Sequence, residues 1–165
     1  MDFQKNDLKE YGFFGFVTVS HLKDNDCNDI PEEKGVYIVV KEDSDPVSFL
    51  EKSIGGHFKG KDPTVSKAKL NSKWVKGAYV LYVGQTGAGK SEATLSSRID
   101  QLIKFGKGRN IGHWGGRYIW QLENAKNLVV AWKCLSMDDP KREKTKLITE
   151  FRNIYGKRPF ANLRE

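Results

Sequence analysis

Three apolar segments with the composition of β-strands constrain the folds open to this chain of 165 residues. They are rich in β-branched and aromatic residues, which favour strands. The three segments are residues 35–41, 78–84 and 127–135. Apolar residues at helical spacing occupy residues 91–105, and Asp139-Pro140 starts a second helix that Gly156 is expected to end. The order strand, strand, helix, strand, helix predicts an α+β domain on a small sheet.

The segments between these elements are less regular. Residues 42–77 hold two Asp-Pro pairs, a Gly-Gly pair and many lysines. They are too long for a hairpin loop, so we expect an insertion with some local structure. Residues 118–122 are interpreted as a short strand, and residues 13–19 could form an extra one. The length predicts a single domain over residues 1–165.

The composition argues against secreted and membrane proteins. Apolar runs stay well short of the roughly eighteen residues that a membrane span requires, and the first residues lack the apolar core of a signal peptide. Cys27 and Cys134 do not have the spacing of a metal site. These features predict an intracellular, cytoplasmic protein with no membrane partner.

The charge is positive and unevenly placed. The chain has 28 Lys and Arg residues against 21 Asp and Glu residues, a net charge of +7. Residues 57–77 hold six lysines and one acid, and residues 101–121 hold four basic residues, several aromatic ones and no acid. Basic side chains can neutralise nucleic-acid phosphates and flat rings can stack on bases, whereas solvated loops beside core aromatics are the alternative. The predicted nucleic-acid contacts are Lys67, Lys69, Lys73, Lys90, Lys104, Arg109, Trp114 and Arg117.

Residues 84–91, GQTGAGKS, match the phosphate-loop pattern between a predicted strand and a predicted helix. In such a loop Lys90 would contact the terminal phosphates and Ser91 would hold Mg²⁺. That fold needs a parallel sheet with helical crossovers, but the chain after Ser91 offers one long apolar strand with no aspartate at its end. We therefore favour a glycine turn here, with a nucleotide-binding protein as the lesser alternative.

Short motifs on the first two predicted strands resemble the two halves of the signature of the GIY-YIG nucleases. Gly35-Val36-Tyr37 resembles the first half and Tyr82-Val83-Gly84 the second. Arg98, Glu150 and Asn162 follow in the order of the family's later motifs. The resemblance implies a small, mainly antiparallel three-stranded sheet flanked by helices.

The resemblance runs over residues 35–162 and has clear departures. Residues 42–77 become a long insertion between the two halves of the signature. The family often has a lysine after the second half and a His or Tyr one turn after the arginine, where this chain has Gln85 and Leu102. His113 is the candidate that supplies the missing polar group from a loop, and Tyr118 is a second candidate.

The resemblance also implies catalytic roles. Tyr37 would be the general base, Arg98 would contact the scissile phosphate, and Tyr82 would orient the water or phosphate. Asn162 would hold the geometry of the site by hydrogen bonds. Glu150 would bind a single Mg²⁺ (or Mn²⁺), which suits a lone carboxylate because this ion keeps several waters and takes phosphate oxygens.

Helix geometry gives a separate argument for two of these residues. At ~100° per residue, Arg98 lies ~60° from Leu95, at the border of the apolar stripe of its helix. Glu150 lies ~60° to the same side of Leu147 on the last helix. A charged residue at such a border can extend into a cleft while its helix packs, although a border salt bridge is the alternative.

Three functional hypotheses follow. The first is a metal-dependent endonuclease that hydrolyses DNA phosphodiester bonds, with a protein partner as a potential source of specificity. The second is a non-catalytic nucleic-acid-binding module on the same fold. The third is the nucleotide-binding protein that uses Lys90.

Overall fold

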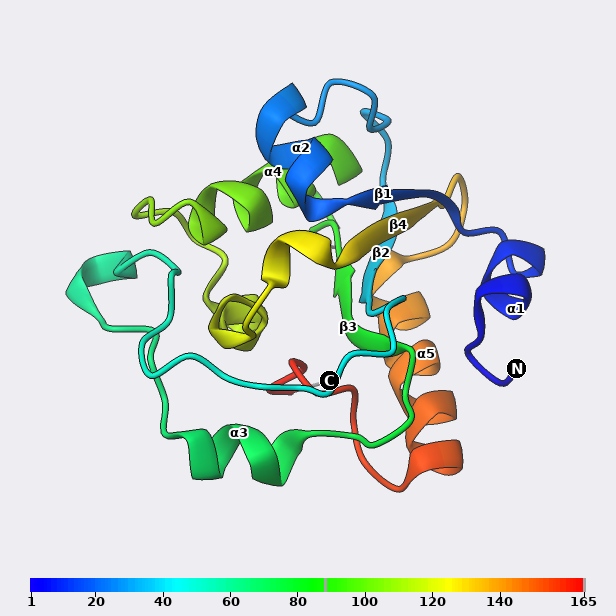
Figure 1. The fold of residues 1–165 in the computed structure, drawn as a ribbon. Helices are drawn as coiled ribbons and strands as arrows, with labels where there is room; N and C mark the ends of the chain where they lie inside the picture. Colours follow the sequence, from blue (N-terminus) through cyan, green and yellow to red (C-terminus); the bar gives the residue numbers. More distant parts are fainter. Residues whose placement is uncertain (88, 165) are drawn as a thin grey trace.

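An antiparallel sheet flanked by helices forms the centre of the computed structural model, which describes residues 1–87 and 89–164 (Figure 1). The strands are β1 (Phe14–Thr18), β2 (Gly35–Val40), β3 (Val80–Gln85) and β4 (Val129–Cys134), and their order in the sheet is β1-β4-β2-β3. The α-helices are α1 (Lys5–Glu10), α2 (Val19–Asn25), α3 (Lys67–Lys73), α4 (Leu95–Gly106) and α5 (Pro140–Tyr155). Three 3₁₀ helices are η1 (Phe58–Gly60), η2 (Trp114–Gln121) and η3 (Ala125–Asn127).

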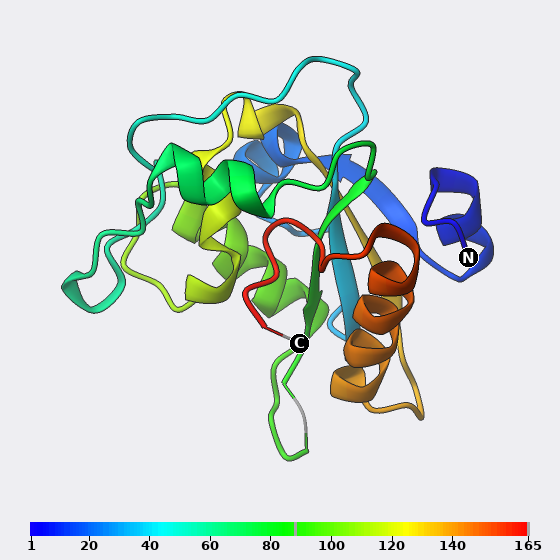
Figure 2. The ribbon, with the colours of Figure 1, turned by 90° about the horizontal axis from the view of Figure 1, so that it is seen from below.

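The two faces of the sheet are covered by different helices. Strand β2 pairs with both β3 and β4, and all six of its residues are buried. Tyr37 and Val39 point to one face, where they pack in a cluster with the apolar residues of α4. The alternate residues Val36, Ile38 and Val40 pack on the other face with the apolar residues of α5. Helices α4 and α5 therefore lie on opposite sides of the sheet (Figure 2).

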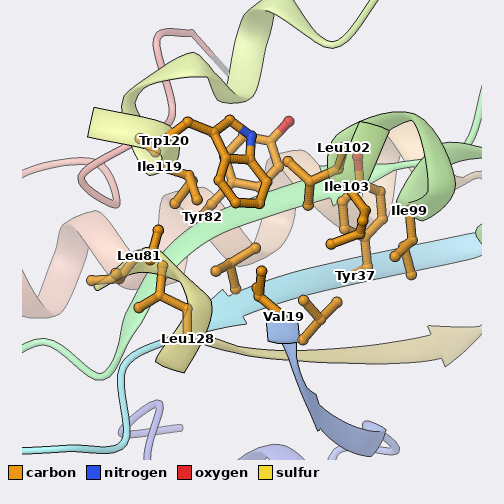
Figure 3. Close-up of a cluster of buried hydrophobic side chains, with 14 of the residues drawn as sticks. Val19, Tyr37, Leu81, Tyr82, Ile99, Leu102, Ile103, Ile119, Trp120 and Leu128 are labelled. Carbon is orange, nitrogen blue, oxygen red and sulfur yellow. The ribbon is translucent and has the colours of Figure 1, made fainter. Parts of the chain in front are cut away.

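Aromatic and branched side chains fill the core on the α4 side. Trp120 of η2, Tyr37 of β2 and Phe105 of α4 are among the largest fully buried side chains of the molecule. Leu102 and Ile103 of α4 reach this core from above the sheet, next to Trp120 and Tyr82 (Figure 3). This packing holds η2 against the sheet, and with it the loop that carries His113.

The glycines of the two signature-like motifs are required by close contacts. Gly84 lies directly opposite Tyr37 in the β2–β3 pair. A Cβ on Gly84 would lie 2.2 Å from Cζ of Tyr37, and a Cβ on Gly35 would lie 2.1 Å from the Lys133 carbonyl oxygen. The Tyr37 ring therefore lies across a backbone that has no side chain to obstruct it.

Helix capping explains where the two long helices begin and end. The Thr94 side chain accepts from the Ser97 N–H at the start of α4, so this helix begins at Leu95 rather than at Ser91. At α5 the Asp139 side chain accepts from the Lys141 N–H and Pro140 occupies the first turn. Gly156 ends this helix in the left-handed conformation with φ of 73°.

The insertion 42–77 is anchored to the core by the side chain of one glutamine. Gln121 Nε2 donates to the carbonyl oxygens of Leu50 and Val65, and Gln121 Oε1 accepts from the Val65 N–H. Helix α3 gives the insertion the local structure that its length predicts. The rings of Phe49 and Trp74 pack against Phe160 near the C-terminus.

Two predictions about strands are wrong. The sheet has four strands rather than three, because β1 adds to the edge of β4. Gly15 and Phe16 have φ of 94° and 54°, and the register shifts between Phe14 and Val17, so this edge strand lacks the alternation that reveals a strand. Residues 118–122 belong mostly to η2 rather than to a strand, because their large side chains pack into the core from a helical segment.

No helix in the described part of the chain is both long enough and apolar enough to cross a membrane.

Candidate functional site

A cationic pocket opens beside β3, between α4, the loop before and into η2, and the C-terminal segment. Its volume is about 760 Å³. The charged side chains that line it are all positive, and no Asp or Glu of the described residues is among them. These cations are Arg98, Arg117, Lys144 and Arg164. We refer to this cavity as the first pocket.

Three of the predicted catalytic rings meet at the inner wall of the first pocket. Tyr37 Oη and His113 Nε2 lie 2.7 Å apart in a buried hydrogen bond. The rings of Tyr37 and Tyr82 have centroids 6.1 Å apart, and those of Tyr82 and His113 are 5.9 Å apart. Tyr82 and His113 line the pocket, whereas Tyr37 is not among its lining residues and is 0% exposed. Tyr37 therefore lies behind the other two rings.

The tautomer of His113 follows from the direction of its hydrogen bond with Tyr37. Tyr82 and Arg98 both lower the pKa of Tyr37, against the larger effect of burial. When the Tyr37 O–H donates to His113 Nε2, the hydrogen of a neutral imidazole lies on Nδ1. His113 Nδ1 is buried and has no hydrogen-bond partner among the described residues. A buried polar atom without a partner is costly to the folded state.

Burial keeps all three rings neutral near pH 7. Desolvation raises the pKa of Tyr37, although the Arg98 charge acts in the opposite direction. Desolvation also raises the pKa of Tyr82 well above its ordinary value. The pKa of His113 is lowered to about 3, first by burial and then by the Arg98 charge. The charge in the first pocket therefore comes from its Arg and Lys side chains.

The cations of the first pocket are close enough to influence one another. Desolvation lowers the pKa of Lys144, and the charges of Arg164 and Arg98 lower it further. Arg98 Nη1 donates to the Gly112 carbonyl oxygen at 3.2 Å and to Gln101, which ties α4 to the His113 loop. The Arg117 guanidinium lies 4.6 Å from the centre of the Trp114 ring. An anion in this pocket would relieve the repulsion among these cations.

Asn162 connects the C-terminal segment to β3. Its Oδ1 accepts from the Val83 N–H and its Nδ2 donates to the Val83 carbonyl oxygen, both at 2.9 Å. Ala161 N–H also donates to the Leu81 carbonyl oxygen at 2.8 Å. The segment thus occupies the open edge of β3 and places Arg164 in the first pocket.

Glu150, the predicted metal ligand, does not line the first pocket. It is half-buried on α5 and is not among the lining residues. It follows Glu143 by nearly two helical turns and so shares its side of the helix. Glu143 accepts from Tyr11 Oη at 2.6 Å, on the side of the N-terminal segment. On α5 it is Lys144, ~100° around the helix from Glu143, that enters the pocket.

The first pocket does not fit a divalent cation held by protein carboxylates. Mg²⁺ and Mn²⁺ prefer oxygen ligands, usually including one or two carboxylates. None of the described lining residues is acidic, and the described residues contain no cluster of three or more His, Cys, Asp or Glu side chains. The metal role of Glu150 stays a prediction from the sequence resemblance.

The other predicted nucleic-acid contacts are distributed over the surface. Trp114 and Arg117 line the first pocket, and Lys73 lines a neighbouring one. Lys67 pairs with Glu51 and Lys104 with Asp100, each at 2.8 Å. Exposed residues that line neither pocket are Lys69, Lys90 and Arg109.

The glycine-rich segment does not have the setting of a phosphate loop. All strand pairs in the described sheet are antiparallel, and α4 begins four residues after Ser91. The first pocket includes Gly87 and Ser91 but not Lys90. Ala88, within the same segment, lies outside the described residues.

Sequence reasoning missed two cations of the first pocket, Lys144 and Arg164. Lys144 lies ~60° from Leu147 on the side opposite to Glu150, so the periodicity of α5 marks it as a second border residue. No local pattern identifies Arg164, because the hydrogen bonds of Asn162 determine its position.

Comparison with known proteins adds no relative, because no protein-family model, no curated protein and no solved structure matches this chain.

The buried His113 predicts a loss of stability in mild acid. Its folded-state pKa of about 3 lies below the ordinary value of 6.5, so below pH ~6.5 the unfolded chain takes up a proton that the folded protein does not. The contribution of His113 to the free energy of unfolding is fully present above pH ~6.5. It falls by about 1.4 kcal/mol per pH unit as the pH is lowered towards 3. Urea unfolding of wild type and His113→Gln at several pH values checks this. We expect the free energy of unfolding to fall more steeply with decreasing pH for the wild type than for His113→Gln. Parallel plots of this free energy against pH for the two proteins would contradict the prediction.

Proposed function

We propose that the first pocket binds a phosphodiester group of DNA and that the protein is a DNA endonuclease. The observation that carries the proposal is that Arg98, Tyr82 and the hydrogen-bonded Tyr37–His113 pair meet at one cavity whose charged lining is entirely cationic. Phosphate groups are matched by Arg side chains, and neutral rings beside them can move protons. The resemblance to GIY-YIG nucleases is part of this proposal.

The cations of the first pocket would stabilise the charge of the reacting phosphoryl group. Arg98 is held by Gln101 and Gly112, so its guanidinium is already oriented before a ligand binds. Donors that are fixed in advance stabilise developing charge at little reorganisation cost. Lys144 and Arg164 add positive charge from α5 and the C-terminal segment.

The three neutral rings offer a path for the proton that the attacking water must lose. Water would pass a proton to Tyr82, whose own proton moves to Tyr37, while the Tyr37 proton moves to His113 Nε2. Solvent water in the first pocket would supply the proton that the leaving oxygen takes up as the P–O bond breaks. The proton that enters the chain of rings returns to solvent after cleavage, so all three rings are neutral again at the end of the reaction. Tyr37 is then a link within the chain rather than the base that contacts water.

A non-cutting nucleic-acid-binding module is the second candidate. The specific observation in its favour is that Glu150, the predicted metal ligand, lies outside the lining of the first pocket. Such a module would bind DNA through the same cations and leave the phosphodiester bond intact.

Replacing Arg98 with alanine is expected to lower the cleavage rate by about 100-fold or more, because it removes a fixed donor to the phosphate. The measurement is nicking of supercoiled plasmid together with binding of a short labelled oligonucleotide. Arg142→Ala is the matched control, because Arg142 is exposed on α5 and lines neither pocket. Equal activity of the two variants would contradict the proposal.

The same assay separates the two candidates and tests the metal. Cleavage that depends on Arg98 supports the endonuclease, whereas binding without cleavage under every ion supports the module. Reactions with Mg²⁺, with Mn²⁺ and with chelator test the cofactor. Loss of cleavage both in chelator and in Glu150→Ala would favour the metal role of Glu150, and cleavage that survives both would favour a pocket that works by its own cations.

A further inference from the structure

A second cationic pocket lies next to the first one, and the C-terminal segment contributes residues to both. Its volume is about 470 Å³. Its charged lining residues are Lys73, Arg152, Lys157 and Arg158, and no acidic residue of the described chain lines it. Asn162 lines both pockets, so the two are neighbours.

This pocket is built from three parts of the chain that are distant in sequence. Helix α3 of the insertion contributes Ser72 and Lys73, and the last turn of α5 contributes Arg152. The remainder comes from residues 156–160 and Asn162. These segments lie together at the end of α5 where the C-terminal segment turns back along β3 (Figure 2).

Contacts between the insertion and the C-terminal segment fix the shape of the second pocket. Lys157 Nζ donates to the carbonyl oxygens of Ser72 and Trp74 at 3.3 and 3.4 Å. The Trp74 and Phe160 rings pack edge-on with centroids 5.1 Å apart. The insertion is therefore held against the chain end and presents Lys73 beside the basic residues that follow α5.

Two of the cations have no carboxylate to neutralise them. Lys73 and Arg158 form no ion pair with any acidic side chain of the described residues. Arg158 is half-buried, so part of its side chain is removed from water, and no acidic side chain of the described residues forms an ion pair with it. A ligand phosphate would supply that missing partner.

We infer that the second pocket binds a phosphate group further along the same nucleic-acid strand that enters the first pocket. The inference rests on the proposed function. It gives the insertion 42–77 a role, which is to complete a second subsite with Lys73 rather than to bind DNA through all of its lysines. The two pockets share Asn162 in their linings, so a strand bound in the first pocket would lead to the second.

The test compares oligonucleotides of increasing length with wild type and with the double variant Lys73→Ala/Arg158→Ala. A short oligonucleotide fills only the first pocket, and a longer one spans both. We expect the double variant to bind the short oligonucleotide normally and to lose the extra affinity of the long one. For the long oligonucleotide, the slope of log K against log salt should become shallower by about 0.7 for each phosphate contact removed.

Two control variants support this comparison. Lys126→Ala/Arg142→Ala removes two exposed cations that line neither pocket, and it should change neither affinity nor salt dependence. Lys73→Arg/Arg158→Lys keeps both charges and should retain most of the affinity for the long oligonucleotide. Thermal unfolding of each variant shows whether it is folded.

The outcomes separate the second pocket from the first. If Arg98→Ala weakens the short oligonucleotide but Lys73→Ala/Arg158→Ala leaves the long one unchanged, the second subsite is overturned and the proposed function stands. If only the double variant weakens binding, the second pocket is supported and the role of the first is overturned. If wild type binds no oligonucleotide of any length, both are overturned.

Discussion

Tyr37→Phe is expected to reduce DNA cleavage by about 100-fold to 10,000-fold, the range that positioned proton transfer contributes in enzymes. The phenyl ring keeps the packing of Tyr37 but removes the hydroxyl between Tyr82 and His113. Because Tyr37 does not line the first pocket, the affinity for a short oligonucleotide should change little. The measurement is the single-turnover cleavage rate at saturating enzyme, with binding measured separately.

Tyr79→Phe is the control for this substitution. Tyr79 Oη donates to Glu42 at 2.8 Å, outside both pockets, so its loss removes one hydroxyl hydrogen bond without affecting the site. Equal cleavage by Tyr37→Phe and Tyr79→Phe would rule out the proton path through Tyr37. A loss of binding in Tyr37→Phe would instead point to a misplaced Arg98, whose charge acts on the Tyr37 hydroxyl.

Gly84→Ala is expected to lower the free energy of unfolding by about 1–3 kcal/mol or more, because overpacking a core usually costs this much. The new Cβ would lie 2.2 Å from Cζ and 2.6 Å from Oη of Tyr37. The Tyr37 ring is fully buried between Tyr82 and His113, so it cannot move into solvent to relieve this contact. Cleavage should fall with stability, because the displaced hydroxyl loses its hydrogen bond to His113.

Denaturant unfolding of Gly84→Ala and Gly115→Ala measures this effect. A Cβ on Gly115 would meet no atom within 4 Å, so this control should change the free energy of unfolding only slightly. A Gly84→Ala protein as stable as the control would show that the Tyr37 ring is not confined against β3.

Local sequence signals predicted the central elements well. The apolar runs at residues 35–41 and 127–135 contain β2 and β4, and the run at 78–84 covers all of β3 except Gln85, because a strand covered on both faces is apolar along its whole length. Asp139, Pro140 and Gly156 bound α5 as predicted, because capping depends on neighbouring residues only. The edge strand β1 was not recognised with the same clarity, because positive φ angles at Gly15 and Phe16 break its pattern.

The candidate site also combines residues whose meeting follows from local signals with residues that only tertiary packing brings in. Tyr37 and Tyr82 are brought together by the register of two adjacent strands. His113 joins them because Trp120 and Ile119 of η2 pack in the core, which no short motif encodes. Arg98 and Glu150 have equal offsets from the apolar stripes of their helices, yet only Arg98 lines the first pocket.

The sequence by itself determined the local elements and the positions of the tyrosines on their strands. These depend on hydrogen bonding, capping and side-chain alternation over a few residues. The tertiary structure decided which charged residues share a cavity. Helices α4 and α5 cover opposite faces of the sheet, so equal angles on the two helices do not point to the same place. For that reason Lys144 rather than Glu150 enters the first pocket. The charged lining of this pocket is therefore positive rather than mixed.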